Sequence, residues 1–194
     1  TPSARAPHRP PIPLMRDEEV IEAPVDRNFL TKRYTEESIR FITANKERPF
    51  FLYLAHAMPG STATPFASPD FQGRSANGQY GDAVEELDWS MGEILKAIKR
   101  LDLDKNTLAV WTSDNGAPRR NPPQGSNLPL KGWGYDTSEG GQRVPCIVRW
   151  PGRARPGMVR DELASTLDIL PTVLAAAGED ALYQSTLLGN TICP

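Results

Sequence analysis

The chain has 194 residues, enough for one domain with a hydrophobic core, and its formal net charge of −2 is spread over 24% charged side chains. No basic face stands out, so we predict no nucleic-acid partner. No apolar run approaches the roughly 20 residues that a membrane-spanning helix needs, so we predict no membrane segment. The two cysteines, Cys146 and Cys193, define neither a disulfide framework nor a metal-ligand spacing.

The first 30 residues contain six of the 19 prolines, a density that resists both a helix and a central strand. We interpret residues 1–30 as an extended arm. The absence of an initiator Met and of a signal-peptide pattern fits a chain cut from a longer one. A helix is predicted from Thr35 to Asn45, because Thr35 can serve as its N-cap and Ile39 and Ile42 share a face.

The middle of the chain predicts a strand, a loop and a long helix. Residues 50–55, Phe-Phe-Leu-Tyr-Leu-Ala, form a continuous apolar run of the kind found in buried parallel strands, and His56 follows it directly. Residues 57–78 are rich in Pro, Gly, Ser and Thr and are predicted to be a loop. From Tyr80 to Ile98, apolar residues recur at spacings of three and four, which predicts an amphipathic helix.

A second apolar strand is predicted over residues 107–112, and it ends in Ser113-Asp114-Asn115-Gly116. Residues 117–141 show no sustained periodicity, and a loop of that length in a compact domain is usually functional.

The C-terminal third predicts a third strand over residues 144–150, in which Cys146 is expected to be a small buried hydrophobic residue. A last helix is predicted over residues 165–177. Pro171 lies inside this helix, so we expect either a kink or a helix in two parts.

This alternation of helices and strands predicts an α/β fold with a mostly parallel sheet flanked by helices. In such sheets, ligands bind at the carboxyl ends of the strands. His56 lies at one predicted strand end, and Asp114 with Asn115 lies at the next. We therefore expect these three side chains along one edge of the sheet.

Asp114 and Asn115 offer adjacent carboxylate and amide oxygens, which are ligands suited to calcium or magnesium. The alternative is a simple turn, because Asp-Asn-Gly is a favoured turn sequence. Two ligands cannot complete a calcium shell of six to eight oxygens, so other groups would have to contribute.

Two further residues are candidates for catalysis. His56 is one of only two histidines, and its alternative role is a structural hydrogen bond. Lys131 lies in the Gly-rich loop, where it could meet an anion as a point charge, or it could be an ordinary surface lysine.

Five segments in order resemble the sulfatase family of the alkaline-phosphatase-like superfamily, namely PFFLYLAHAMP, YGDAVEELDWSMGEIL, NTLAVWTSDNG, SEGGQRVPCIVRWPG and DELASTLDILPTVLAAAG. The pattern is most similar to arylsulfatase A-like and N-acetylgalactosamine-6-sulfatase-like enzymes, in the C-terminal part of their catalytic domain. The resemblance divides the chain into the arm, a sulfatase-like part over residues 31–179 and a divergent tail over residues 180–194.

The resemblance implies hydrolysis of a sulfate ester, such as a sulfated sugar, by a formylglycine nucleophile and a calcium ion. It implies that Asp114 and Asn115 are calcium ligands, and that histidine and lysine residues, here His56 and Lys131, assist at the developing charges. It also implies a partial alkaline-phosphatase-like sandwich. Members of the family are commonly secreted, lysosomal or periplasmic, which leaves the compartment open.

Three departures from the family pattern bear on activity. No C-x-P-S-R-like motif for the formylglycine occurs in the sequence. Gly60 stands where members commonly carry a second histidine, and Gly134 stands at the usual lysine position, with Lys131 at the family's arginine. The formylglycine is therefore expected only in an N-terminal half outside this chain, and the chain alone is expected to be inactive.

Two interpretations of the function stay open. One is a sulfatase fragment whose nucleophile lies elsewhere. The alternative is a non-catalytic, truncated or degenerate sulfatase-like domain that acts as a binding or interaction module. A phosphodiesterase or phosphomutase of the same superfamily ranks below both, because LDWSMGEIL and SEGGQRVP resemble sulfatases specifically.

Overall fold

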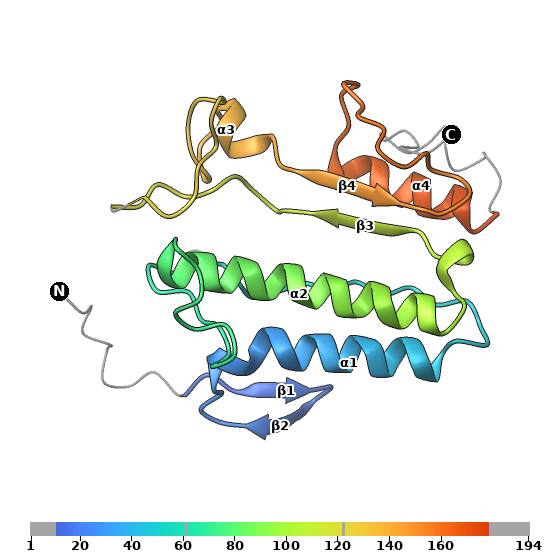
Figure 1. Cartoon of the computed structure of the whole chain (residues 1–194), viewed down its shortest axis with the longest axis horizontal. Helices are drawn as coiled ribbons and strands as arrows, with labels where there is room; N and C mark the ends of the chain where they lie inside the picture. The colour runs from blue at the N-terminus through green and yellow to red at the C-terminus, as the bar shows by residue number, and fades with distance from the viewer. Residues whose placement is uncertain (1–10, 61, 122, 179–194) are drawn as a thin grey trace. The chain divides into compact units, whose positions relative to one another are not determined.

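The structure is a computed structural model, and it describes residues 11–60, 62–121 and 123–178 (Figure 1). The chain divides into two compact units. The first comprises Thr1–Ala97 and Ala117–Ser126, and the second comprises Ile98–Gly116 and Asn127–Pro194. Each unit is described by itself. The predicted tail, residues 180–194 with Cys193, lies outside the described residues, as does the start of the predicted arm, residues 1–10.

The described part of the predicted arm is not extended throughout. Strands β1 (Leu14–Arg16) and β2 (Glu19–Glu22) form an antiparallel hairpin, and a 3₁₀ turn, η1 (Arg27–Phe29), follows. The hairpin is tied to the next helix by ion pairs of Arg16 with Glu37, at 2.6 Å, and of Arg33 with Glu22. Residues 14–29 are therefore part of the first unit.

The first helix, α1 (Leu30–Ala44), begins five residues before the predicted start. Thr35 is not its N-cap. Thr35 lies inside the helix, where its hydroxyl donates to the carbonyl of Thr31 at 2.7 Å. The N-cap of the helical segment is Asp26, whose carboxylate accepts from the backbone N–H of Asn28 at 3.0 Å, so the helical path starts with η1.

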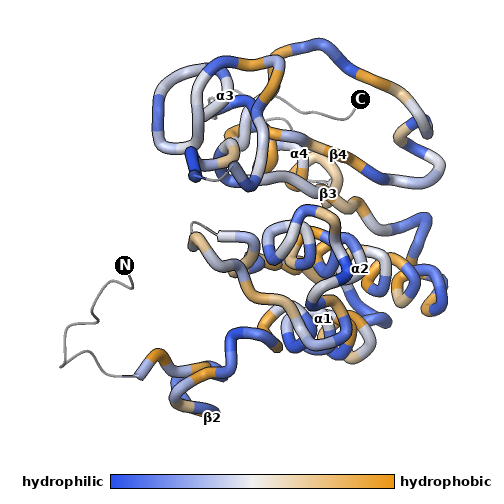
Figure 2. The backbone as a smooth tube through the Cα atoms, turned by 60° about the vertical axis from the view of Figure 1, so that its left-hand side comes forward, coloured by the Kyte–Doolittle hydropathy of each residue, from blue (hydrophilic) through white to orange (hydrophobic). Residues whose placement is uncertain are grey.

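The long helix α2 (Gly78–Arg100) confirms the predicted amphipathic helix, and hydrophobic and hydrophilic positions alternate around both α1 and α2 (Figure 2). Its buried face within the first unit includes Ala83, Leu87, Ile94 and Ala97. The face also carries Ser90, whose hydroxyl lies 2.6 Å from that of Thr35 on α1. The two helices therefore pack through apolar side chains and one buried pair of hydroxyls.

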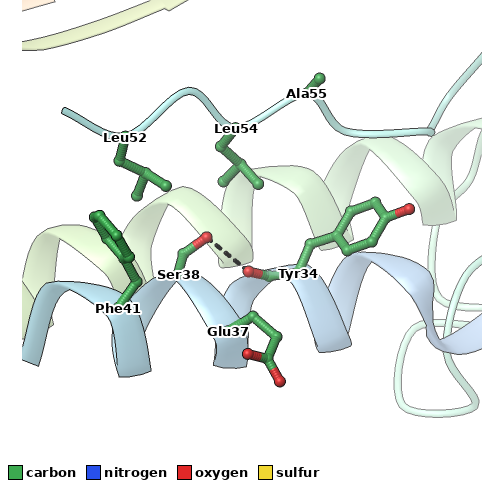
Figure 3. Close-up of a pocket in the computed structure, with 7 residues that line it drawn as sticks. All are labelled: Tyr34, Glu37, Ser38, Phe41, Leu52, Leu54 and Ala55. Carbon is green, nitrogen blue, oxygen red and sulfur yellow. Dashed lines mark hydrogen bonds between the residues drawn. The ribbon is translucent and has the colours of Figure 1, made fainter. Parts of the chain in front are cut away.

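The predicted strand over residues 50–55 is not assigned as a strand among the described residues. The segment is extended beside α1, with Leu52 and Leu54 half-buried and Phe51 and Tyr53 exposed by 68% and 81%. Figure 3 shows Leu52 and Leu54 pointing toward Phe41 and Ser38 of α1, around a pocket of about 340 Å³. The apolar run thus buries one face, where two were predicted.

In the second unit, β3 (Ala109–Thr112) pairs with β4 (Cys146–Arg149), and Val110 lies opposite Val148. This pair and the β1–β2 hairpin are both antiparallel, so the mostly parallel sheet predicted from the sequence is not found in the described part of the chain. A continuous apolar run predicts burial on two faces, but it does not fix the direction of the partner strand.

Two side chains of β4 show how the pair is held. Arg149 forms two hydrogen bonds with the Asp104 carboxylate, at 2.8 and 3.1 Å, which tie β4 to the turn that precedes β3. At the other end of the strand, Cys146 is exposed, so the prediction that it is buried is wrong. Ile147, the next residue of β4, is exposed by 62% as well, so the end of the strand that carries Cys146 is open on both faces.

The last helical segment has two parts, which is one of the two alternatives that Pro171 predicted. A 3₁₀ turn, η3 (Thr166–Asp168), leads into α4 (Ile169–Ala176), and Ser165 and Asp168 form a reciprocal capping box. Pro171 lies in the first turn of α4, where its lack of an N–H leaves no hydrogen bond unmade. Gly178 follows the helix with φ of +85°.

Two buried carboxylates of α2, those of Asp82 and Glu86, hold the loop that precedes α2 in the chain. Asp82, exposed by only 3%, accepts from the backbone N–H groups of Gly73, Arg74 and Ser75 at 2.8, 3.1 and 2.8 Å. Glu86 is fully buried and accepts from the N–H of Ser68 at 3.0 Å. The N–H donors, that of Ser75 foremost, hold the pKa of Asp82 below its usual value of 3.8.

Replacement of Asp82 by Ala is expected to release this loop. The amides of Gly73, Arg74 and Ser75 should then exchange with solvent at least about tenfold faster, because each loses a charged acceptor. Hydrogen exchange followed by NMR measures the change, and Asp88→Ala, an exposed carboxylate on the same helix, is the control.

The protection of the same amides from hydrogen exchange should also depend on pH in a defined direction. Because the pKa of Asp82 is lowered in the folded chain, protection should persist at pH 4 and above and disappear only as the pH falls through the lowered value. Unchanged exchange in Asp82→Ala, or loss of protection well above pH 4, would contradict this role of Asp82.

Candidate functional site

The candidate site is built around the turn that follows β3. The strand ends at Thr112, the backbone bends at Asp114 and Asn115, and the hydroxyl of Ser113 donates to the carbonyl of Asn115 at 3.0 Å. Asp114 is exposed and Asn115 is half-buried. Because the strand has ended, these consecutive side chains are no longer forced to opposite faces.

Backbone contacts fix this turn against the Gly-rich loop of residues 131–141. The last three residues of this loop belong to helix α3 (Glu139–Gln142), so the loop predicted over residues 117–141 ends in a short helix. The N–H of Gly116 donates to the carbonyl of Gly141 at 2.9 Å, and the N–H of Gly140 donates to the carbonyl of Lys131 at 2.7 Å. A Cβ on Gly116 would lie 1.8 Å from the carbonyl oxygen of Gly140. The contact is therefore possible only because neither backbone carries a side chain at this point.

Gly134 brings the loop against Asn115 in the same way. A Cβ on Gly134 would lie 2.2 Å from the carbonyl oxygen of Gly116 and 2.9 Å from Oδ1 of Asn115. The amide of Asn115 is thus directed at the backbone of the Gly-rich loop. Lys131, on the same loop, has an exposed side chain. The structure therefore brings the turn that carries Asp114 and Asn115 together with the loop that carries Lys131.

Asp136 organises the Gly-rich loop, and the sequence analysis did not single it out. Its carboxylate accepts from the N–H groups of Trp133 and Ser138, both at 2.9 Å, and from the hydroxyl of Ser138. The Ser138 hydroxyl and these N–H groups lower the pKa of Asp136. The signal was present in the sequence, since an Asp two residues before a Ser is typical of an Asx turn.

The donor set fits part of a calcium shell. Asp114 supplies a carboxylate and Asn115 a neutral carbonyl oxygen, both of the hard type that calcium prefers. Within the described ranges, no group of three or more His, Cys, Asp or Glu side chains is placed to hold a metal ion. The two residues can therefore contribute ligands but do not form a complete site by themselves.

His56 belongs to the first unit, and its surroundings there resemble those of a structural histidine. Its Nε2 lies 3.3 Å from the hydroxyl of Ser90, which continues to Thr35 on α1. Burial lowers the pKa of His56, so the ring is neutral near pH 7. Because Asp114, Asn115 and Lys131 belong to the second unit, their alignment with His56 along one edge stays a prediction.

Gly60 and Gly134, which stand where the family resemblance implies a histidine and a lysine, suit the backbone around them. Gly60 has φ of +60°, a conformation that a histidine rarely adopts, and a Cβ there would lie 2.9 Å from the carbonyl oxygen of Ala57. Gly134 is buried against Gly116. Neither position could accept the family residue without a local shift of the chain.

The comparisons with known proteins identify the family of the chain. The family model described as Sulfatase matches residues 6–179, and the chain belongs to the sulfatase family. It is 41% identical over 187 residues to the steryl-sulfatase of Mus musculus, covering 93% of this chain and 30% of the relative. It is 41% identical over 183 residues to the N-acetylgalactosamine-6-sulfatase of Mus musculus, covering 88% of this chain and 35% of the relative.

Solved structures show the same fold. The structure of Ps i-CgsB in complex with k-i-k-neocarrahexaose aligns with a TM-score of 0.77 and 29% identity, over 93% of this chain and 40% of that one. The PsFucS1 sulfatase from Pseudoalteromonas sp. aligns with a TM-score of 0.74 and 28% identity, over 89% of this chain and 35% of that one. The chain thus shares the alkaline-phosphatase-like sulfatase fold, and it spans about a third of the length of the curated relatives it matches.

Because of the contact at Gly116, Gly116→Ala and Gly92→Ala should change the free energy of unfolding in opposite directions. Gly116→Ala places a methyl group against the Gly140 carbonyl and should lower the free energy of unfolding by about 1–3 kcal/mol, as overpacking does. Gly92→Ala, in the middle of α2 with nothing within 4 Å of the new Cβ, should instead raise it by about 0.5–1 kcal/mol.

Urea unfolding followed by circular dichroism measures both variants. The contact between the turn and the Gly-rich loop would be rejected if Gly116→Ala were as stable as the parent chain. The Gly92→Ala variant shows that the effect comes from the position and not from the loss of a glycine as such.

Proposed function

We propose that the protein hydrolyses sulfate esters, and that this chain contributes two calcium ligands, Asp114 and Asn115, to its active site. The observation that carries the proposal is the bend after β3, packed by glycines against the loop of Lys131, in a chain about 40% identical to two kinds of sulfatase. The whole activity is a proposal because the chain spans about a third of these relatives.

Each residue has a defined part in this proposal. When bound, calcium would neutralise the charge on the sulfate oxygens. Asp114 would supply negative charge to the ion, Asn115 a neutral oxygen, and Lys131 a positive charge facing the anionic group. His56, neutral near pH 7 because burial lowers its pKa, would donate or accept a hydrogen bond and would not add charge.

The proposed nucleophile is a formylglycine outside these 194 residues, because no C-x-P-S-R-like motif occurs among them. The proposed substrate is a sulfated sugar. The names of the N-acetylgalactosamine-6-sulfatases and of the neocarrahexaose complex support this class, although the steryl-sulfatases are equally similar in sequence.

Calcium binding by the chain itself tests the ligand assignment. With two protein ligands and water in the other positions, the dissociation constant is expected in the millimolar range, as in the weakest oxygen-ligand sites. Asp114→Ala should abolish the binding in a calorimetric or NMR titration, and Asn115→Ala should weaken it.

The matched control is Asp161→Ala, an exposed carboxylate of the same unit. Calcium binding that survives in Asp114→Ala, or that is lost equally in Asp161→Ala, would contradict the assignment. Micromolar affinity in the parent chain would show that further ligands are present among these residues.

The reading frame upstream of Thr1 in the source gene tests the enzymatic part of the proposal. It is expected to encode a C-x-P-S-R-like motif, and the polypeptide from the complete frame is expected to hydrolyse an aryl sulfate. Asp114→Ala in that polypeptide should lower kcat/KM by at least about a hundredfold, because residues of one catalytic unit act together. A complete frame without the motif would favour the non-catalytic alternative.

A further inference from the structure

The first unit contains a polar pocket of about 380 Å³ that shares no residue with the proposed calcium site. Its lining residues come from the 3₁₀ turn η1, from the loop over residues 64–72 and from the start of α2, and all of them belong to this one unit. Small-molecule sites in proteins usually have volumes of about 300–1,000 Å³. The pocket is therefore large enough for one small ligand, or for one unit of a longer chain.

Two neutral amides of the lining are held by one end. The side-chain N–H of Asn28 donates to the Asp26 carboxylate at 3.0 Å, and that of Gln72 donates to the carbonyl of Ala67 at 2.7 Å. Among the described residues, neither amide oxygen accepts a hydrogen bond. Each amide is thus oriented by its nitrogen and keeps its oxygen as an acceptor for a ligand.

Two further side chains of the lining can both donate and accept. Thr64 and Gln79 are exposed, and in the part of the chain that the structure describes neither side chain is engaged in a hydrogen bond. A hydroxyl and a primary amide each offer a donor and an acceptor. A ligand can reach both groups from the solvent, and it would meet donors as well as acceptors at this end of the pocket.

The charges of the lining exclude an ionic ligand. No Lys or Arg is among the described residues that line the pocket, so an anion would find no cationic partner. The one carboxylate is Asp82, and both of its oxygens already accept from the loop N–H groups. A cation would therefore meet a carboxylate that is already engaged. The ligand that fits is neutral and rich in hydrogen-bonding groups.

An apolar wall completes the pocket. Pro65, Phe66 and Ala67 form this wall, and Pro65 and Ala67 are buried. A pyranose ring combines hydroxyl groups around its edge with C–H groups on its faces. Neutral amides and a hydroxyl beside an apolar wall match both parts of such a ring.

The wall is preformed, because the loop that carries it is held from two sides. The N–H of Phe66 donates to the sulfur of Met58 at 3.2 Å, and the N–H of Ser68 donates to the buried Glu86 of α2 at 3.0 Å. A loop that is already ordered does not have to be ordered by the ligand, which favours binding.

We propose that this pocket binds a neutral sugar unit, an unsulfated hexose or N-acetylhexosamine of a carbohydrate chain. The contacts would be made by the oxygens of Asn28 and Gln72, by the side chains of Thr64 and Gln79, and by the wall at Phe66. The inference goes beyond the proposed hydrolysis of sulfate esters, and it does not depend on it.

NMR titration of this chain with four defined probes tests the proposal. The neutral probes are methyl β-D-galactopyranoside and methyl N-acetyl-β-D-galactosaminide. The charged probes are butylammonium chloride and sodium sulfate, used at constant ionic strength. At least one glycoside is expected to give saturable shifts at the backbone amides of Phe66 and Ala67 and at the side-chain amide of Gln79, with a dissociation constant of about 1–10 mM.

Two substitutions remove exposed groups of the lining without touching the core. Thr64→Val keeps the shape of the side chain and removes its hydroxyl, and Gln79→Ala removes an amide. Each should weaken glycoside binding about fivefold, as the loss of one neutral hydrogen bond does, and the double variant should weaken it at least about tenfold. The matched control is Gln142→Ala, an exposed glutamine of the second unit, which should leave the affinity unchanged.

Three results would overturn the proposal. The first is the absence of saturable shifts with either glycoside up to about 50 mM, well above the expected dissociation constant. The second is saturation of the same amides by butylammonium or by sulfate, because the pocket would then bind a charged group. The third is a loss of affinity in Gln142→Ala as large as in Gln79→Ala.

Failure of this proposal is distinguishable from failure of the proposed function. Asp114→Ala should leave glycoside binding unchanged, because Asp114 does not line the pocket. If Asp114→Ala abolishes calcium binding and neither glycoside binds, the sugar site fails alone. If a glycoside binds in a manner that depends on Gln79 and the chain binds no calcium, the ligand assignment fails and the sugar site stands.

Discussion

The candidate site depends on one contact between the turn after β3 and the Gly-rich loop, where the two backbones come close because glycines leave no side chains between them. A side chain at Gly116 or Gly134 would occupy the space of a carbonyl oxygen, at 1.8 and 2.2 Å respectively. The hydrogen bond from Gly116 to Gly141 closes the contact. The orientation of Asn115 and the course of the loop that carries Lys131 both follow from this approach, with Asp136 fixing the loop from within.

The first unit is held by a different kind of interaction. Its principal helix, α2, buries Asp82, Glu86 and Ser90 together with its apolar residues. These polar groups are not isolated, because Asp82 and Glu86 accept from loop N–H groups and Ser90 contacts hydroxyl and imidazole groups. The three N–H bonds to Asp82 specify one arrangement of loop and helix more strictly than apolar contacts do, whereas only one oxygen of Glu86 has a partner among the described residues. His56 contacts the same helix through Ser90.

The sequence predicted the family, the long helix and the turn at Asp114, because each has a strong local pattern. It did not predict the antiparallel pairing of β3 with β4, since strand direction depends on partners that the local pattern does not encode. The predicted start of α1 was too late in the chain. Thr35 was expected to cap the helix, but its hydroxyl donates to the carbonyl of Thr31 inside the helix. The buried role of Glu86 was hidden as well, because a carboxylate on a helix is solvated unless tertiary contacts enclose it.

The extended run over residues 50–55 has a practical consequence for handling the protein. It is six residues of aromatic and aliphatic side chains without a charge or a proline, and Phe51 and Tyr53 face outward. Within the described residues, this segment is not paired in a sheet. Such a segment is a template for intermolecular strand addition and fibril formation. Concentrated samples of the chain should therefore self-associate through this segment, and a lysine in place of Tyr53 would act as a gatekeeper against it.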